Sequence, residues 1–121
     1  MNIAVHETRK NFVKFDDEHF LLYLNEQAAQ YTAPESEEKK DGYSYTGPEA
    51  DGGTLIEAKA VTGDNRRAKF ISGLIATKYP LDAQIAVLAN GKDTKEHAAE
   101  LKEFEEFRAE CKAAIDELLA R

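Results

Sequence analysis

The first third of the chain alternates apolar with polar residues, which is the pattern of half-buried β-strands. Ile3 and Val5 alternate with small or polar neighbours, and two further short apolar runs follow at residues 11–15 (NFVKF) and 19–24 (HFLLYL). Residues 16–18 (DDE) form a polar break between these runs, which predicts a tight turn. We therefore expect a β-hairpin within an N-terminal antiparallel sheet.

The middle of the chain is rich in charged and turn-forming residues. Residues 34–53 hold two of the three prolines and four of the seven glycines, which predicts a loop-rich linker. Residues 35–41 (ESEEKKD) contain no apolar side chain, so we expect them to be mobile. On either side of the linker, residues 27–32 fit a strand or a short helix. Residues 54–60 (TLIEAKA) fit a strand or a helix, and the two glycines that precede them favour a strand.

From Asp64 onward, apolar residues recur at spacings of three and four, which predicts amphipathic helices. The first helix has Asp64 as its N-cap and ends before Pro80, because residues that precede a proline avoid the α region. The second helix has Asp82 as its N-cap and ends at residues 90–91 (NG). The third begins at residues 93–94 and continues to the C-terminus.

These elements predict a single α+β domain over residues 1–121. Its β-rich part is residues 1–33, its loop-rich linker is residues 34–53, and its mainly helical part is residues 54–121. The predicted architecture is a small N-terminal antiparallel sheet, followed by the loop-rich segment and three C-terminal helices.

Charge and cysteine content restrict the partners and the compartment. The net charge of −7 argues against a nucleic-acid partner, because phosphate binding requires clustered Lys and Arg. Cys111 is the only cysteine, which suits a reducing compartment. No apolar run approaches the roughly 20 residues that span a membrane, and the N-terminus lacks the apolar stretch of a leader peptide. We expect a cytoplasmic protein without a membrane partner.

No residue pattern points to catalysis. His6, His19 and His97 are scattered, and there is no second cysteine, so the spacing of a metal site is missing. Cys111 lies at a core-type position, and as a nucleophile it would need a histidine beside it. We therefore expect no catalytic residue, no cofactor, no metal and no enzymatic activity.

Partner binding is expected at two places. The first is an apolar stripe on the third helix that is wider than a small sheet can cover, formed by Leu101, Phe104, Phe107, Cys111 and Leu118. Its spacing fits packing within the domain, and an added contact to a second copy or to another protein stays open. The second place is Tyr43 and Tyr45, which either anchor their segment onto the sheet or offer a stacking surface.

The two helices around Pro80 fit either a DNA-binding helix-turn-helix at residues 64–90 or a corner between packed helices. A recognition helix needs Arg, Lys, Asn or Gln on its exposed face. The second helix (DAQIAVLAN) offers only Gln84 and Asn90, so the sequence favours the corner.

Two segments of the C-terminal half carry a family pattern. Residues 73–93 combine a Leu-Ile pair, a Lys-Tyr pair and a short Ile/Ala/Leu helix, and residues 103–115 place aromatic residues before Cys-Lys. With residues 43–47 (YSYTG) and 51–58 (DGGTLIEA), the pattern covers roughly residues 43–115. It resembles small accessory proteins of tailed phages and prophages, which are commonly encoded near tail or tail-fibre genes. The matching residues are Leu74, Ile75, Lys78, Tyr79, Ile85, Ala86, Leu88, Phe104, Phe107, Cys111 and Lys112.

The resemblance implies a non-enzymatic structural or tail/fibre assembly protein that acts through protein–protein contacts. Its partner is then a tail or fibre protein or a second copy, met in the host cytoplasm or on the virion. Two alternatives remain: a small DNA-binding regulator that uses residues 64–90, and a bacterial interaction module unrelated to phage.

Overall fold

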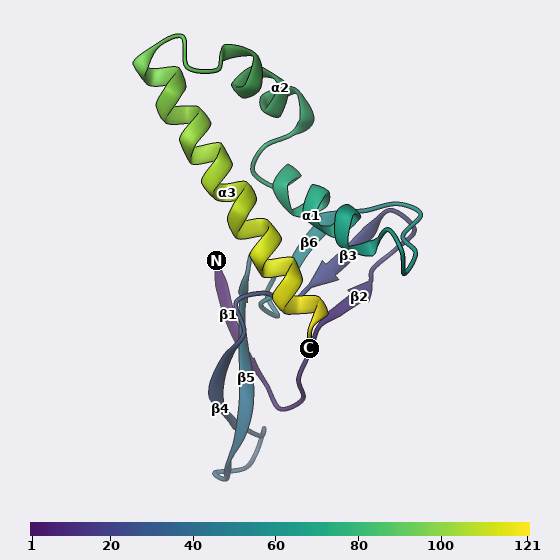
Figure 1. Cartoon of the computed structure of the whole chain (residues 1–121). Coiled ribbons are helices and arrows are strands. Elements are labelled where there is room, and N and C mark those ends of the chain that lie inside the picture. The colour runs from purple at the N-terminus through teal and green to yellow at the C-terminus, as the bar shows by residue number, and fades with distance from the viewer.

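The computed structural model describes residues 1–121 and contains six β-strands followed by three α-helices (Figure 1). The strands form two separate three-stranded antiparallel sheets, and the last helix lies at the C-terminus. The predicted α+β class is therefore confirmed. The sequence led us to expect one N-terminal sheet, whereas the structure has two.

The first sheet has the strand order β1-β5-β4 and consists of β1 (Asn2–His6), β5 (Lys39–Gly47) and β4 (Gln27–Thr32). The strand expected around Ile3 and Val5 is confirmed as β1. Residues 27–32, for which the sequence fitted either a strand or a short helix, form a strand. The hairpin of β4 and β5 projects away from the helices, toward the lower end of the molecule in Figure 1.

The prediction of a loop-rich linker at residues 34–53 is wrong for its central part. β5 spans nine of these residues and is the middle strand of the first sheet. Lys39, Lys40 and Asp41, which belong to the charge run expected to be mobile, pair with Thr32, Tyr31 and Gln30 of β4. This end of the hairpin is largely exposed, so backbone pairing holds it without the apolar alternation that marks a half-buried strand.

The second sheet has the order β2-β3-β6 and consists of β2 (Phe12–Lys14), β3 (His19–Leu22) and β6 (Thr54–Glu57). The hairpin expected around residues 16–18 is confirmed, and the Phe15 amide donates to the His19 carbonyl at 3.0 Å to close its turn. The strand favoured for residues 54–60 is also confirmed, over its first four residues.

The helices are α1 (Arg66–Ala76), α2 (Leu81–Asn90) and α3 (Lys95–Leu119). All three were expected, but two of the predicted N-caps are wrong. Asn65 rather than Asp64 precedes α1, and Pro80 rather than Asp82 precedes α2, where proline needs no amide partner. Only α3 has a side-chain cap, in which the Thr94 hydroxyl accepts from the His97 amide at 3.0 Å.

The core lies where the second sheet meets α1 and α3. Helix α1 approaches β6 so closely that a Cβ at Gly73 would come within 2.6 Å of the Glu57 carbonyl oxygen, so this contact requires glycine. The thirteen buried core residues are Leu22, Leu24, Ile56, Ala58, Phe70, Ile71, Leu74, Ile75, Leu101, Phe104, Cys111, Ile115 and Leu118.

No helix combines the length and the apolar composition required to cross a bilayer.

Candidate protein-interaction site

Helix α2 exposes an apolar stripe to solvent. Leu81 is 71 % exposed, and Ile85 and Leu88 are each 58 % exposed. Their i, i+4, i+7 spacing places these three side chains on one side of the helix, which we call the α2 face. Asp82 is the only charged residue of α2, and none of its ten residues is fully buried. Scattered apolar residues are normal on a protein surface, whereas contiguous exposed apolar patches are typical of interaction sites.

The α2 face is held in place by the turn that precedes it. Tyr79 packs edge-to-face against Phe104, with ring centroids 4.9 Å apart, and its ring also lies 5.6 Å from that of Phe107. The Gln84 side-chain amide donates to the Tyr79 carbonyl at 2.8 Å, which ties α2 to this turn. At the other end Gly91 stops the helix with a φ of 56°. Helix α2 lies at the opposite end of the molecule from the β4–β5 hairpin (Figure 1).

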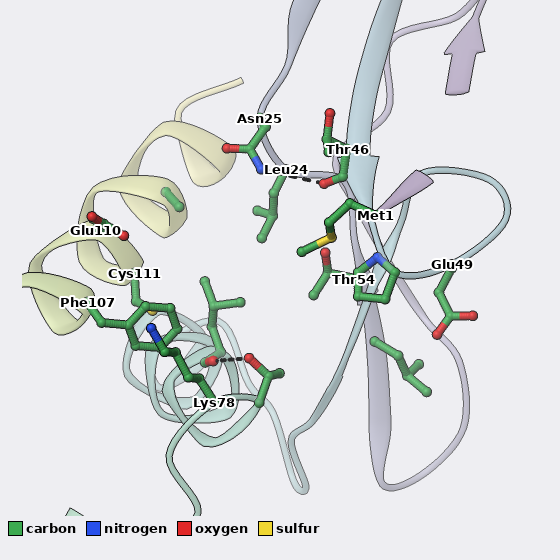
Figure 2. Close-up of a pocket in the computed structure, with 15 residues that line it drawn as sticks. Met1, Leu24, Asn25, Thr46, Glu49, Thr54, Lys78, Phe107, Glu110 and Cys111 are labelled. Carbon is green, nitrogen blue, oxygen red and sulfur yellow. Dashed lines mark hydrogen bonds between the residues drawn. The ribbon is translucent and has the colours of Figure 1, made fainter. Parts of the chain in front are cut away.

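A pocket of about 620 Å³ lies between the first sheet, α1 and α3. Figure 2 shows Phe107 and Cys111 on the α3 side of this pocket, and Met1 and Thr46 on the opposite side. Its volume falls in the range of about 300–1,000 Å³ that small-molecule sites occupy. Its rim carries Lys78, Glu49 and Glu110, charges of both signs, and therefore selects neither an anion nor a cation.

Lys78 and Cys111, the cation and the thiol of the pocket, have little freedom to react with a ligand. Lys78 Nζ lies 3.7 Å from a Glu103 oxygen and 5.1 Å from the centroid of the Phe107 ring, a cation–π contact. Burial, with a smaller contribution from Glu110, raises the pKa of the Cys111 thiol to about 11. Cys111 is therefore a protonated thiol at neutral pH and serves as part of the apolar wall.

The stripe expected on α3 is core rather than surface. Leu101, Phe104, Cys111 and Leu118 are at most 9 % exposed, so they cannot present apolar surface to a partner, and that expectation is wrong. They are covered because the second sheet, α1 and the turn at Tyr79 all pack onto this helix. Phe107 alone is partly exposed, at the pocket.

Tyr43 and Tyr45 form the second expected partner-binding site, and they differ in exposure. Tyr45 is fully buried, and its hydroxyl donates to Glu26 at 2.7 Å and accepts from the Lys10 amide at 2.8 Å. Tyr43 is half-buried, with the Arg9 guanidinium 5.9 Å from its ring centroid. The i, i+2 spacing puts both rings on one side of β5. The hydrogen bonds of Tyr45 tie the strand to Lys10 and Glu26.

A polar cluster lies beside Tyr45, on the same side of the first sheet. The Tyr23 hydroxyl donates to Asp51 at 2.7 Å, and burial together with Asp51 raises the pKa of Tyr23 to about 12. The same hydrogen bond, with a lesser one from the Gly53 amide, lowers the pKa of Asp51. The side-chain oxygens of Tyr23, Tyr45 and Asp51 all have hydrogen-bond partners inside the protein. The cluster therefore links segments of the chain and offers no free reactive group.

Glu26 connects this cluster to the two arginines at its edge. Desolvation raises the pKa of Glu26, but hydrogen bonds from Arg9 and Tyr45 and the charge of Arg121 outweigh it, so the net shift is downward. Arg9 holds the carboxylate with a fork of hydrogen bonds between 2.8 and 3.1 Å. The carboxylate is thus kept ionised as a structural link.

Comparison with protein-family models, with curated proteins and with solved structures finds no match. Sequence reasoning placed Ile85 and Leu88 among the residues of the family pattern but did not assign them to a partner-binding surface. One signal was available: this helix is the shortest of the three, and Asp82 is its only charged residue.

Proposed function

We propose that this chain is a non-enzymatic structural or tail/fibre assembly protein of the tailed-phage type, and that it binds its protein partner through the α2 face. The observation that carries the proposal is the exposure of Leu81, Ile85 and Leu88 on a helix with a single charged residue. Water-exposed leucine and isoleucine side chains gain roughly 1.5–3 kcal/mol each when a partner covers them fully.

The resemblance to phage accessory proteins supports the same surface. Some of its matching residues are core, as expected of packing positions, including Leu74, Ile75 and Phe104. Ile85, Ala86 and Leu88 are exposed on α2 instead, so packing within the chain does not account for them. A partner surface does.

The order of α1 and α2 also fits the DNA-binding alternative, but the exposed side of α2 opposes it. Groove contacts require cationic or amide side chains, and α2 has neither Arg nor Lys. The Gln84 amide is already engaged with the Tyr79 carbonyl. An interaction module unrelated to phage would use the same α2 face and differ only in its partner.

The proposal is tested by mixing the protein with each product of the genes that flank its own and detecting complexes by size-exclusion chromatography. We expect a tail or fibre protein to co-elute. The variant Leu81→Ser/Ile85→Ser/Leu88→Ser should bind that partner about 100-fold more weakly or worse, because three apolar contacts are lost. Its melting temperature should stay within a few degrees of the original, since these side chains are already exposed.

The matched control is Val13→Ser/Phe15→Ser, which removes two apolar side chains that are 50 % and 64 % exposed at the β2 hairpin. It should bind as the unchanged protein does. Undiminished binding by the α2 variant would place the contact elsewhere. If the flanking gene product that co-elutes is neither a tail nor a fibre protein, the alternative of a module unrelated to phage is favoured. Salt-sensitive binding of duplex DNA would favour the regulator.

A further inference from the structure

The two sheets have four edges, and only one of them combines large exposed apolar side chains with a free strand of more than three residues. Helix α1 packs on β6 at Gly73, and β2 is only three residues long. The outer edge of β4 carries Gln, Ala, Tyr and Thr side chains, none of them a large exposed hydrophobic group. The remaining edge is β1, whose pairing within the chain is with β5 alone.

Strand β1 lacks the features by which proteins protect an edge. Met1, Ile3 and Val5 lie on one side of it, because side chains alternate along a strand, and they are 89 %, 72 % and 38 % exposed. The strand has no lysine, no proline and no break in its register with β5. Such an edge is a template for another strand.

The sequence of β1 (NIAVH) is complementary to itself when a second copy runs antiparallel about Ala4. In that register Ile3 of one copy lies opposite Val5 of the other, so two apolar pairs form on the exposed side of the sheet. Ala4 faces its own copy, and Asn2 faces His6. No carboxylate and no lysine lies within the paired residues, although each copy carries a net charge of −7.

We propose that β1 pairs with β1 of a second copy and joins two three-stranded sheets into one six-stranded antiparallel sheet. Aligned apolar cross-strand pairs stabilise such a joint, and the ladder of backbone hydrogen bonds extends across it. Five residues a side are few against the 20–30 of a stable interface, so the dimer is weak and forms in a concentration-dependent way.

Formation of this dimer does not depend on the proposed function, but a dimer would bind a partner more tightly than a monomer does. Each copy contributes one α2 face, so a pair presents two such faces to a repetitive partner. Binding of the second face is then intramolecular, which raises the overall affinity without any new contact.

The first test is sedimentation equilibrium of the full chain from micromolar to millimolar concentration. We expect a monomer–dimer equilibrium. The variant Ile3→Lys/Val5→Lys should weaken dimerisation at least about tenfold, because like charges then oppose each other across the joint. The control Val13→Lys/Phe15→Lys adds the same charge at two exposed positions of the β2 hairpin and should dimerise like the unchanged protein.

The register is tested by mixing single variants. Ile3→Lys mixed with Val5→Glu should dimerise more strongly than Ile3→Lys mixed with Ile3→Glu, because only the first mixture places opposite charges directly across the joint. This comparison holds even if the double variant fails to fold. A protein that stays monomeric at every concentration, a double lysine variant that dimerises undiminished, or equal dimerisation of the two mixtures would overturn the proposal.

Discussion

Replacing Phe104 with alanine is expected to lower the free energy of unfolding by about 3–5 kcal/mol. The side chain is 1 % exposed and packs edge-to-face on Tyr79, with the ring centroids 4.9 Å apart. Its removal leaves a cavity at the junction of α3 with the turn that leads into α2. Urea denaturation monitored by circular dichroism measures the loss.

The matched control is Phe107→Ala, one helical turn further along α3. Phe107 is half-buried at the pocket, where solvent can fill the space that the ring vacates, so we expect less than half the loss seen for Phe104→Ala. Equal losses would contradict the assignment of these two rings to core and pocket wall.

The second large effect is expected for Arg121→Ala, with a loss of about 2–4 kcal/mol. The Arg121 side chain is only 2 % exposed, and one of its nitrogens donates to the Lys10 carbonyl at 2.9 Å and to the Tyr23 carbonyl at 2.6 Å. These hydrogen bonds connect the C-terminal end of α3 to the segments around Lys10 and Tyr23, about a hundred residues earlier in the chain. Without the guanidinium, these two partly buried carbonyls lose a charged donor.

Arg67→Ala is the control for Arg121→Ala. Arg67 makes a comparable two-pronged contact with Asp116, at 2.7 and 3.1 Å, but both side chains are more than half exposed. Exposed ion pairs contribute less than about 1 kcal/mol, so this variant should melt close to the original. Thermal melts of both variants in the same buffer make the comparison. A greater loss for Arg67→Ala would refute the structural role given to Arg121.

The helices and the first hairpin could be predicted because apolar periodicity and turn residues act locally. Gly91 marks the end of α2 in the sequence as it does in the structure. Helix α1 ends at Ala76, earlier than the proline predicts, and Pro80 directly precedes α2. The N-caps were less predictable, since Asp64, Asn65 and Asp82 are all chemically suited to the role. Only the path of the backbone decides which residue takes it.

Strand β5 could not be predicted, because its outer half lacks the pattern of a half-buried strand. Lys39 to Asp41 are exposed, and their backbone pairs with residues of β4 that lie seven to eleven positions earlier in the chain. A charge run predicts a solvated segment correctly, but solvation alone does not distinguish a loop from the exposed end of a hairpin.

The candidate site could not be predicted from the sequence either, because its exposure depends on tertiary packing. Both α2 and α3 carry apolar stripes, and sequence alone does not reveal which stripe the rest of the chain covers. The tertiary structure buries Phe104 and leaves Ile85 in water. The polar cluster was unpredictable for a related reason, since Tyr23 and Asp51 meet only once both sheets have formed.

Hydrogen exchange, measured by mass spectrometry on the free protein and on its complex with the partner, tests the central claim most directly. Helix α2 is short and partly solvated, so its amides should exchange quickly in the free protein. The account predicts that partner binding slows exchange over residues 81–90 and leaves residues 101–118 unchanged. Slowed exchange elsewhere, with residues 81–90 unaffected, would contradict it.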